Sequence, residues 1–186
     1  MNHTVTSRQE ILRVSRELIR QRGFPAVNIR SVAGACGVSV GSIYNYFTSK
    51  EDLLGAAVES VWQDIFCRPE DTEVFRNTQA CVAWLYRCSE RGSGEYPGFF
   101  TLHAVSFLPL EKVQGKQRMQ QAWRHILEQL CTVLRNDPNI RPDAFDARLS
   151  REEFADVIFS LMLSALLRGD YDPAPVQELV RRVLYE

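Results

Sequence analysis

Apolar residues recur along this chain every three or four positions, which is the spacing of amphipathic helices. A first helix is expected from Ser7 to Arg22, with Ser7 and Glu10 forming a capping box and Gly23 ending the helix. No segment alternates apolar and polar residues as a half-buried strand does. The pattern predicts an all-α protein. Comparable start and stop signals elsewhere in the chain are Ser49, Ser150 with Glu153, and Gly169.

A helix-turn-helix is expected between residues 28 and 47. Asn28 is a competent cap for a short helix, and Gly37 suits the left-handed backbone of a tight turn. Ser39 then caps a second short helix, and Val38 and Ile43 are expected to point into the core. A recognition helix presents its remaining side chains to the major groove of DNA, so the segment predicts DNA binding. The side chains left for such a partner are Val40, Gly41, Ser42, Tyr44, Asn45 and Tyr46.

Six more helices are expected after this motif. The fourth helix, residues 50–67, connects an N-terminal head, residues 1–50, to a larger helical body, residues 68–186. The pattern thus predicts about nine helices, three in the head and most of the others in a bundle. The helices of the body are expected over residues 71–91, 99–108, 110–135 and 150–167 and from Pro173 or Pro175 to Tyr185, with the loop 91–98 breaking the first of them.

The net charge of −1 is divided unevenly along the chain. Residues 1–50 hold seven basic and two acidic side chains, a net charge of +5. Residues 51–186 hold fifteen basic and twenty-one acidic side chains, a net charge of −6. A basic head is attracted to phosphate, whereas an acidic body is repelled by it. The alternative is that a small helical domain carries this charge by chance.

The helix-turn-helix resembles that of the TetR family of transcription regulators. The resemblance covers the first third of the chain, with Asn28 where a threonine is common, Ile29 adding an apolar residue beside it, and Tyr46 where a histidine is frequent. It implies a homodimeric repressor that binds a near-palindromic double-stranded DNA operator and is released by a small-molecule effector. The motif residues are Gly23, Val32-Ala33, Cys36-Gly37-Val38-Ser39, Tyr44-Asn45-Tyr46-Phe47, Ser49-Lys50, and Glu51 with Leu53-Leu54.

DNA contacts are expected in two groups. Tyr44, Lys50 and the amides that begin the recognition helix and the fourth helix are expected to bind phosphates. Asn45 has the paired donor and acceptor that suit adenine, and Val40 can contact a thymine methyl group. Tyr46 has a second interpretation, in which its ring packs against the fourth helix. The complete predicted set is Asn28, Ser39, Val40, Gly41, Ser42, Tyr44, Asn45, Tyr46 and Lys50.

Aromatic and soft side chains in the body predict a pocket for an apolar ligand. His103 is expected to orient the ligand, and Glu95 and Tyr96 border a loop that could gate entry. An aromatic stripe at helical spacing is also typical of plain core, and this alternative stays open for each residue. The predicted ligand-binding residues are Trp62, Phe66, Trp84, Phe99, Phe100, His103, Phe107, Trp123, Phe159 and Met162.

The helix expected over residues 150–167 is apolar nearly all round, so it needs cover on two sides. A second copy of the chain can supply one side in a two-fold bundle, and the alternative is a core helix of a monomer. The predicted dimer residues are Phe154, Val157, Ile158, Leu161, Ala165, Val176, Leu179, Val180 and Val183.

Other classes of protein are poorly supported by the sequence. The five scattered cysteines, the polar N-terminus and the lack of a long apolar run predict a cytoplasmic protein without a disulfide framework or membrane span. No metal-binding or catalytic motif is present, so neither an enzyme nor a cofactor is expected. Two alternatives remain, namely a helical ligand- or protein-binding module without specific DNA recognition, and a redox sensor using Cys81 and Cys88.

Overall fold

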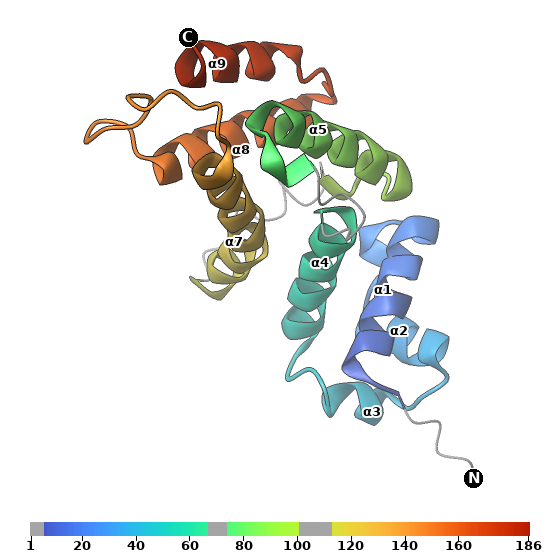
Figure 1. The fold of residues 1–186 in the computed structure, drawn as a ribbon. Helices are drawn as coiled ribbons and strands as arrows, with labels where there is room; N and C mark the ends of the chain where they lie inside the picture. The colour runs from blue at the N-terminus through green and yellow to red at the C-terminus, as the bar shows by residue number, and fades with distance from the viewer. Residues whose placement is uncertain (1–5, 67–73, 101–112) are drawn as a thin grey trace. The chain divides into compact units, whose positions relative to one another are not determined.

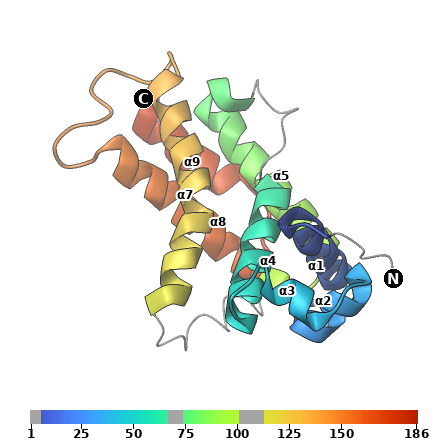
Figure 2. The same ribbon diagram turned by 90° about the horizontal axis from the view of Figure 1, so that it is seen from below.

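The computed structural model describes residues 6–66, 74–100 and 113–186, with the side chains of residues 113–122 left out (Figures 1 and 2). The described residues form eight α-helices that are complete, 3₁₀ turns at residues 24–26 and 74–76, and no strand, so the predicted all-α class is confirmed. Phe99 and Phe100 are helical, and the rest of the helix expected over residues 99–108 lies outside the described residues. The elements are α1 (Arg8–Arg22), η1 (Phe24–Ala26), α2 (Ile29–Cys36), α3 (Val40–Tyr44), α4 (Lys50–Phe66), α5 (Thr78–Glu95), α7 (Val113–Asn136), α8 (Arg151–Arg168) and α9 (Ala174–Leu184).

Most helix ends lie where the capping residues predict them. The Ser7 hydroxyl accepts a hydrogen bond from the Glu10 amide at the start of α1. Asn28 and Ser150 each close a full capping box, with Ser31 and Glu153 respectively. A capping box of this kind satisfies amides that have no partner within the helix. Left-handed glycines end two helices, with φ of 67° at Gly37 after α2 and at Gly169 after α8.

The predicted break in α5 is wrong. The sequence places a loop over residues 91–98, but α5 continues through Gly92 and Gly94 to Glu95. Gly92 is required for packing instead, because a Cβ at this position would lie 2.7 Å from Cδ1 of Ile65 on α4. The left-handed glycine that ends this region is Gly98, with φ of 71°.

The chain divides into two compact units. The first contains residues 1–64 and 93–120, and the second contains residues 65–92 and 121–186. In the first unit, α1 lies alongside α4, and α2 and α3 complete the helix-turn-helix (Figures 1 and 2). This division into compact units does not test the functional boundary expected after residue 50, which stays a prediction. The fully buried core of the first unit includes Ile11, Ile19, Val32, Ile43, Phe47, Leu53 and Val61.

The second unit is tied together by a buried carboxylate. Oδ2 of Asp137 accepts hydrogen bonds from the Thr78 amide at 2.8 Å, the Thr78 hydroxyl at 2.9 Å and the Tyr185 hydroxyl at 2.6 Å. Asp137 thereby joins the start of α5, the end of α7 and the residue after α9. Burial alone would raise the pKa of Asp137, but the bonds from Tyr185, Thr78 and Asn139 together hold it below its ordinary value.

The dimer residues that the sequence predicts on α8 do not form one exposed face. The exposed large apolar side chains of α8 are Val157, 42% exposed, and Leu161, 36% exposed, with Leu167 near its end. On α9, Leu179 is 38% exposed. Burial inside the subunit removes Phe154, Ile158, Ala165, Val176 and Val180 from the predicted interface, while Val183 is half-buried.

Within the described part of the chain, none of the helices has the length and apolar character that crossing a bilayer requires.

Candidate nucleic-acid interface

Helix α3 is only five residues long and is held in place from both ends. Oγ of Ser39 accepts the Ser42 amide at 3.1 Å and lies 2.9 Å from the Ser42 hydroxyl. Before it, the left-handed Gly37 closes the turn from α2. Ile43 and Phe47 are almost completely buried and fix the inner side of the helix. An isolated helix of this length is unstable in water, so these contacts give α3 its conformation.

The outer side of α3 is apolar and exposed. Val40 is 41% exposed, Tyr44 50% and Tyr46, just beyond the helix, 40%. These are three of the seven large apolar side chains exposed among the described residues, which marks this surface for a partner. The Tyr44 hydroxyl makes no hydrogen bond to any described residue, and Asn45 is exposed beside it. The surface therefore offers apolar contact, one hydroxyl and one amide together.

Four predicted DNA contacts also have roles within the protein. Oδ1 of Asn28 accepts the Ser31 amide at 3.0 Å and so caps α2. The hydroxyls of Ser39 and Ser42 bond to each other at the start of α3. The Tyr46 hydroxyl donates a hydrogen bond to the Thr6 carbonyl oxygen at 2.6 Å. Among the predicted contacts, the side chains of Val40, Tyr44, Asn45 and Lys50 have no such internal hydrogen bond in the described structure.

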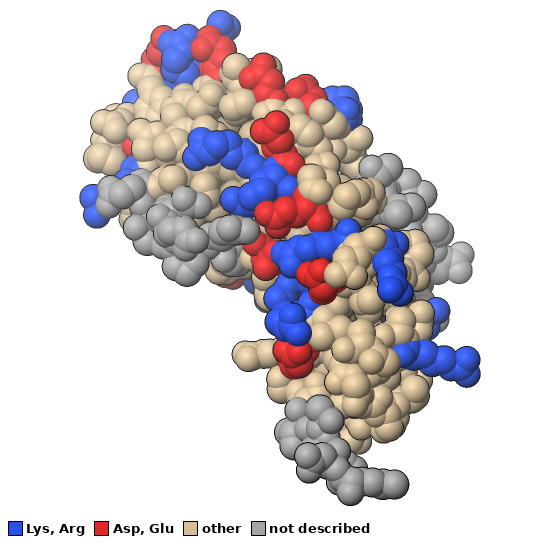
Figure 3. Space-filling model, turned by 90° about the vertical axis from the view of Figure 1, so that its right-hand side faces the viewer, with Lys and Arg blue, Asp and Glu red and all other residues tan. Residues whose placement is uncertain are grey.

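Several arginines of the head are already paired with acids. Arg13 binds Glu10 at 2.7 Å, and Arg20 binds Asp64 at 2.7 Å. Arg16 lies 3.7 Å from Asp64 and also bonds to Ser60. Figure 3 shows such mixing on one face of the molecule, where Lys and Arg side chains lie next to Asp and Glu. The net charge of +5 over residues 1–50 therefore overstates the positive surface, because acids later in the sequence neutralise part of it.

Four basic side chains of the head have no acidic partner within the described structure. They come from the start of α1, the end of α1, the first turn of α2 and the start of α4, and all four are exposed. Lys50, on the first turn of α4, follows Ser49, whose hydroxyl accepts the Asp52 amide at 3.0 Å. A side chain of this kind that also lies beside the recognition helix can bind phosphate without first breaking an ion pair. The four are Arg8, Arg22, Arg30 and Lys50.

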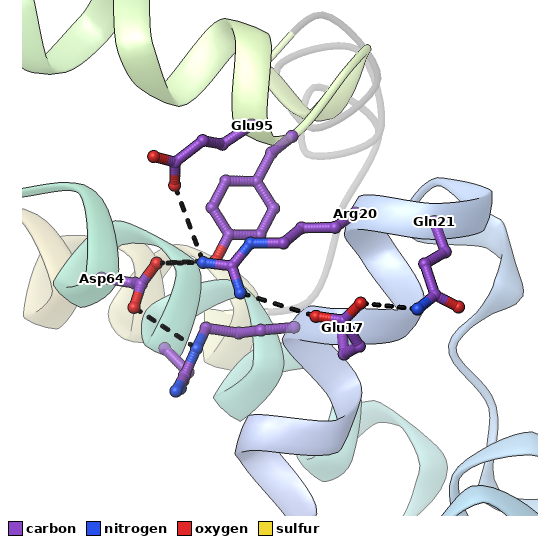
Figure 4. A network of polar contacts seen from close by, with 8 residues as sticks. Glu17, Arg20, Gln21, Asp64 and Glu95 are labelled. Carbon is purple, nitrogen blue, oxygen red and sulfur yellow. Dashed lines mark hydrogen bonds and ion pairs between the residues drawn. The ribbon is translucent and has the colours of Figure 1, made fainter.

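Glu95 and Tyr96, which the sequence places beside a possible gating loop, belong to a polar cluster in which Tyr96 is buried. Its hydroxyl donates to Oδ2 of Asp64 at 2.8 Å, and its ring lies under Arg20, whose guanidinium carbon is 4.7 Å from the ring centroid. Figure 4 shows Arg20 between Asp64, Glu17 and Glu95 in this cluster. Burial and the bond to Asp64 raise the pKa of Tyr96. The cluster holds α1, α4 and the end of α5 together within the first unit.

Several of the predicted ligand-binding residues pack against one another within their own unit. In the first unit Trp62 contacts Phe100, with ring centroids 5.5 Å apart, and in the second unit Trp123 contacts Phe159 at 5.5 Å. Phe99 and Met162 are buried as well. Such close mutual packing fits the core alternative for these residues. His103 and Phe107 lie outside the described residues.

Phe66 and Trp84 of the predicted set do share a small cavity in the second unit. Its volume is about 10 Å³, which is about the room that one water needs. Sequence reasoning missed its polar lining, His125 and Gln129, although their spacing of four places both on one face of α7. The remaining lining residues are Phe75, Cys81, Leu85, Ile126 and Leu130.

Cys81 and Cys88, for which the sequence leaves a redox role open as an alternative, are both buried. Burial, with a smaller contribution from the neighbouring Cys88, raises the pKa of the Cys81 thiol to about 12. A thiol of this kind is almost wholly protonated near neutral pH, whereas oxidants react with the thiolate. This environment favours the interpretation of Cys81 and Cys88 as small buried apolar residues. Among the described residues, no three His, Cys, Asp or Glu side chains gather as a metal site would require.

Residues 11–57, which contain the whole helix-turn-helix, match the family model for bacterial regulatory proteins of the tetR family. The helix-turn-helix segment of the chain is thus similar to that of the tetR family. It is 34% identical over 59 residues to the transcriptional repressor KstR2 of Rhodococcus jostii, a match covering 32% of this chain and 29% of the relative. It is 33% identical over 52 residues to the transcriptional regulator UidR of Escherichia coli, covering 28% and 26%. The match thus spans less than a third of the length of these relatives.

Solved structures resemble this chain over nearly its whole length. The transcriptional regulator FadR from Bacillus subtilis, solved in complex with stearoyl-CoA, has a TM-score of 0.65 at 18% identity, and the match covers 97% of this chain and 98% of that one. A TetR-family regulator from Rhodococcus has a TM-score of 0.71 at 16% identity, covering 99% and 100%. At these identities the likeness shows that the fold is shared.

Proposed function

We propose that this protein is a DNA-binding transcription regulator of the TetR family, with α3 as its recognition helix. The observation that carries the proposal is the exposed surface of Val40, Tyr44 and Asn45 on a short helix fixed by caps and buried residues. In this assignment Asn45 and Val40 contact base edges, and Tyr44 and Lys50 bind phosphate. The regulator is a homodimer, so that two copies of α3 contact the two halves of a near-palindromic site.

We propose further that the protein is a repressor released by a small molecule. The cavity beside Phe66 and Trp84 is the candidate effector site, and its volume means that a ligand larger than water must widen it. Helix α4 supports a link between effector and DNA, because one continuous helix begins at Lys50 and ends at the cavity residue Phe66. Release requires the effector to favour the state that does not bind DNA, by a coupling of about 1–3 kcal/mol.

Selection from a random pool of duplex DNA tests the proposal first. A dimeric specific regulator enriches a near-palindrome whose half-sites lie about one helical turn, or a small multiple of it, apart. Enrichment should persist with competitor DNA that abolishes non-specific binding. A folded dimer that enriches no sequence, after extraction of any bound small molecule, would contradict specific recognition and favour the binding module.

Replacing Tyr44 and Lys50 together by alanine tests the phosphate contacts. We expect weaker binding to operator and unrelated duplexes alike, and a less steep dependence of affinity on salt, because phosphate contacts carry no sequence information. Filter binding or fluorescence anisotropy across a salt series measures both. The matched control is Arg148→Ala, which removes an exposed charge from the loop before α8. Unchanged binding by the double variant would show that the contact surface lies elsewhere.

A further inference from the structure

The residues just before α1 are attached to the recognition element. Tyr46, at the end of that element, donates its hydroxyl to the Thr6 carbonyl oxygen at 2.6 Å, and Thr6 is buried. Two residues later, the Arg8 guanidinium carbon lies 5.4 Å from the ring centroid of Phe47. Phe47 is 1% exposed, so its position is fixed by the core. These two contacts hold Arg8 beside the end of α3.

Arg8 differs in its surroundings from most arginines of the same helix. Arg13, Arg16 and Arg20 all bind acidic side chains, as described above. Arg8 is exposed and has no acidic partner among the described residues. Arg22 is similarly exposed and without an acid, but at about 1.5 Å per residue it lies roughly 21 Å further along α1. Only Arg8 combines a free positive charge on α1 with contact to the residues that follow α3.

We infer that Arg8 is a phosphate-binding residue of the DNA interface, held in place by Phe47 and by the Tyr46–Thr6 hydrogen bond. The inference rests on the proposed function of α3. A guanidinium that lies against an aromatic ring uses its flat face, so its N–H groups, which point outward in its own plane, stay available for phosphate oxygens. A recognition helix of five residues reaches little of the duplex, and flanking contacts of this kind fix its register.

Tyr46 acquires a different role from the base contact that the sequence predicts. Its hydroxyl donates to the Thr6 carbonyl oxygen. Tyr46 is therefore a positioning residue that places the start of α1, and with it Arg8, beside the DNA. Arg8 itself binds the backbone of the duplex, which is the same for every base sequence. Its effect on affinity is therefore uniform across sequences, whereas the effect of Asn45 depends on the base.

The test compares Arg8→Gln, Arg8→Lys and the control Arg22→Gln in salt-dependent binding to the selected operator and to an unrelated duplex. Each phosphate contact contributes about 0.9 to the steepness of the slope of log affinity against log salt. A dimer has two Arg8 side chains, so the slope of Arg8→Gln should be less steep by about 1.8. Between 50 and 200 mM salt its affinity should then fall about twelvefold less than that of the wild type. Arg8→Lys should keep most of the slope, and Arg22→Gln all of it.

Tyr46→Phe supplies the second arm, since it removes one hydroxyl and keeps the ring. It should weaken binding when Arg8 is present and have little further effect in the Arg8→Gln variant. Thermal melting followed by circular dichroism confirms that the variants compared are folded. A wild-type slope in folded Arg8→Gln, or an equal loss in Arg22→Gln, would overturn the inference alone. Wild-type protein that binds neither duplex would overturn the proposed function and the inference with it.

Discussion

Asn28, Ser39 and Ser150 each precede a helix and accept a hydrogen bond from an amide three residues later. The sequence predicts these bonds because both partners lie within four positions of each other, where helix geometry fixes their distance. Asp137 has no such local signal. Its partners Thr78 and Tyr185 lie 59 and 48 positions away, so only the packed second unit brings them together. At the scale of residues, local contacts were predictable and distant ones were not.

Replacing Asp137 by Asn should destabilise the second unit by about 2 kcal/mol at neutral pH, because hydrogen bonds to a charged acceptor are lost. The lowered pKa of Asp137 sets the pH dependence. Its stabilising effect is present above the ordinary Asp pKa of about 4 and is lost as the pH falls through the lower value of the folded state. Urea unfolding of wild type and Asp137→Asn should therefore differ at pH 7 and converge below about pH 4.

Asp143→Asn is the control for this prediction. Asp143 is an exposed carboxylate with one ion pair, to Arg141 at 3.1 Å. Exposed pairs contribute about 0–1 kcal/mol, so this variant should unfold close to the wild type. Equal unfolding free energies for Asp137→Asn and Asp143→Asn at pH 7 would contradict the role given to Asp137.

Helix α5 shows what a local pattern can miss at the scale of elements. Two glycines within three residues usually indicate a loop, and the sequence therefore predicts a break near Arg91. The structure uses Gly92 for close packing of α5 against Ile65 of α4. Ile65 lies 27 positions earlier in the chain, so the reason for the glycine is visible only once the two helices are packed. The start and end of α8, set by Ser150 and Gly169, were predictable because their signals are local.

Gly92→Ala and Gly94→Ala should have opposite effects on stability although both glycines lie in α5. At Gly92 the added methyl group meets three atoms of Ile65 at 2.7–3.0 Å, and overpacking of this kind costs about 1–3 kcal/mol. At Gly94 nothing lies within 4 Å of the added carbon, so the better helix propensity of alanine should stabilise by up to about 1 kcal/mol. Chemical denaturation measures both. Equal effects at the two positions would refute the packing role of Gly92.

The exposed residues of the described chain agree with two predicted surfaces, one for DNA and one for a partner subunit. They reduce the number of residues available to the partner subunit. Six of the seven exposed large apolar side chains belong to residues that the sequence assigns to DNA or to a partner subunit. The sequence could not define the inner side of α8, because a helix apolar nearly all round has no distinct polar face to orient it. Most of the predicted stripe on α8 is consequently core. The sequence could not separate pocket residues from core residues in the predicted ligand set for a similar reason, since aromatic residues of core and pocket look alike in sequence.

The exposed apolar residues of α8 and α9 lead to a prediction about assembly. Val157 and Leu161 are one turn apart on α8, and Leu179 is exposed on α9, so all three are available to a second copy of the chain. The variant Val157→Glu with Leu161→Glu places charges on this surface, where two copies would bring like charges together without water. We expect the wild type to sediment at about twice the chain mass of 21.3 kDa and this variant as a monomer.

The matched control is Val40→Glu, which places the same charge on an equally exposed valine of α3. It should leave the dimer intact and abolish operator binding, because the carboxylate is repelled by phosphate. The α8 variant should lose operator affinity for a different reason, since a monomer contacts one half-site and loses the gain of binding two linked sites. A monomeric wild type, or a variant that remains dimeric, would show that the exposed face of α8 serves another purpose. Dissociation by Val40→Glu would instead place the subunit contact at α3.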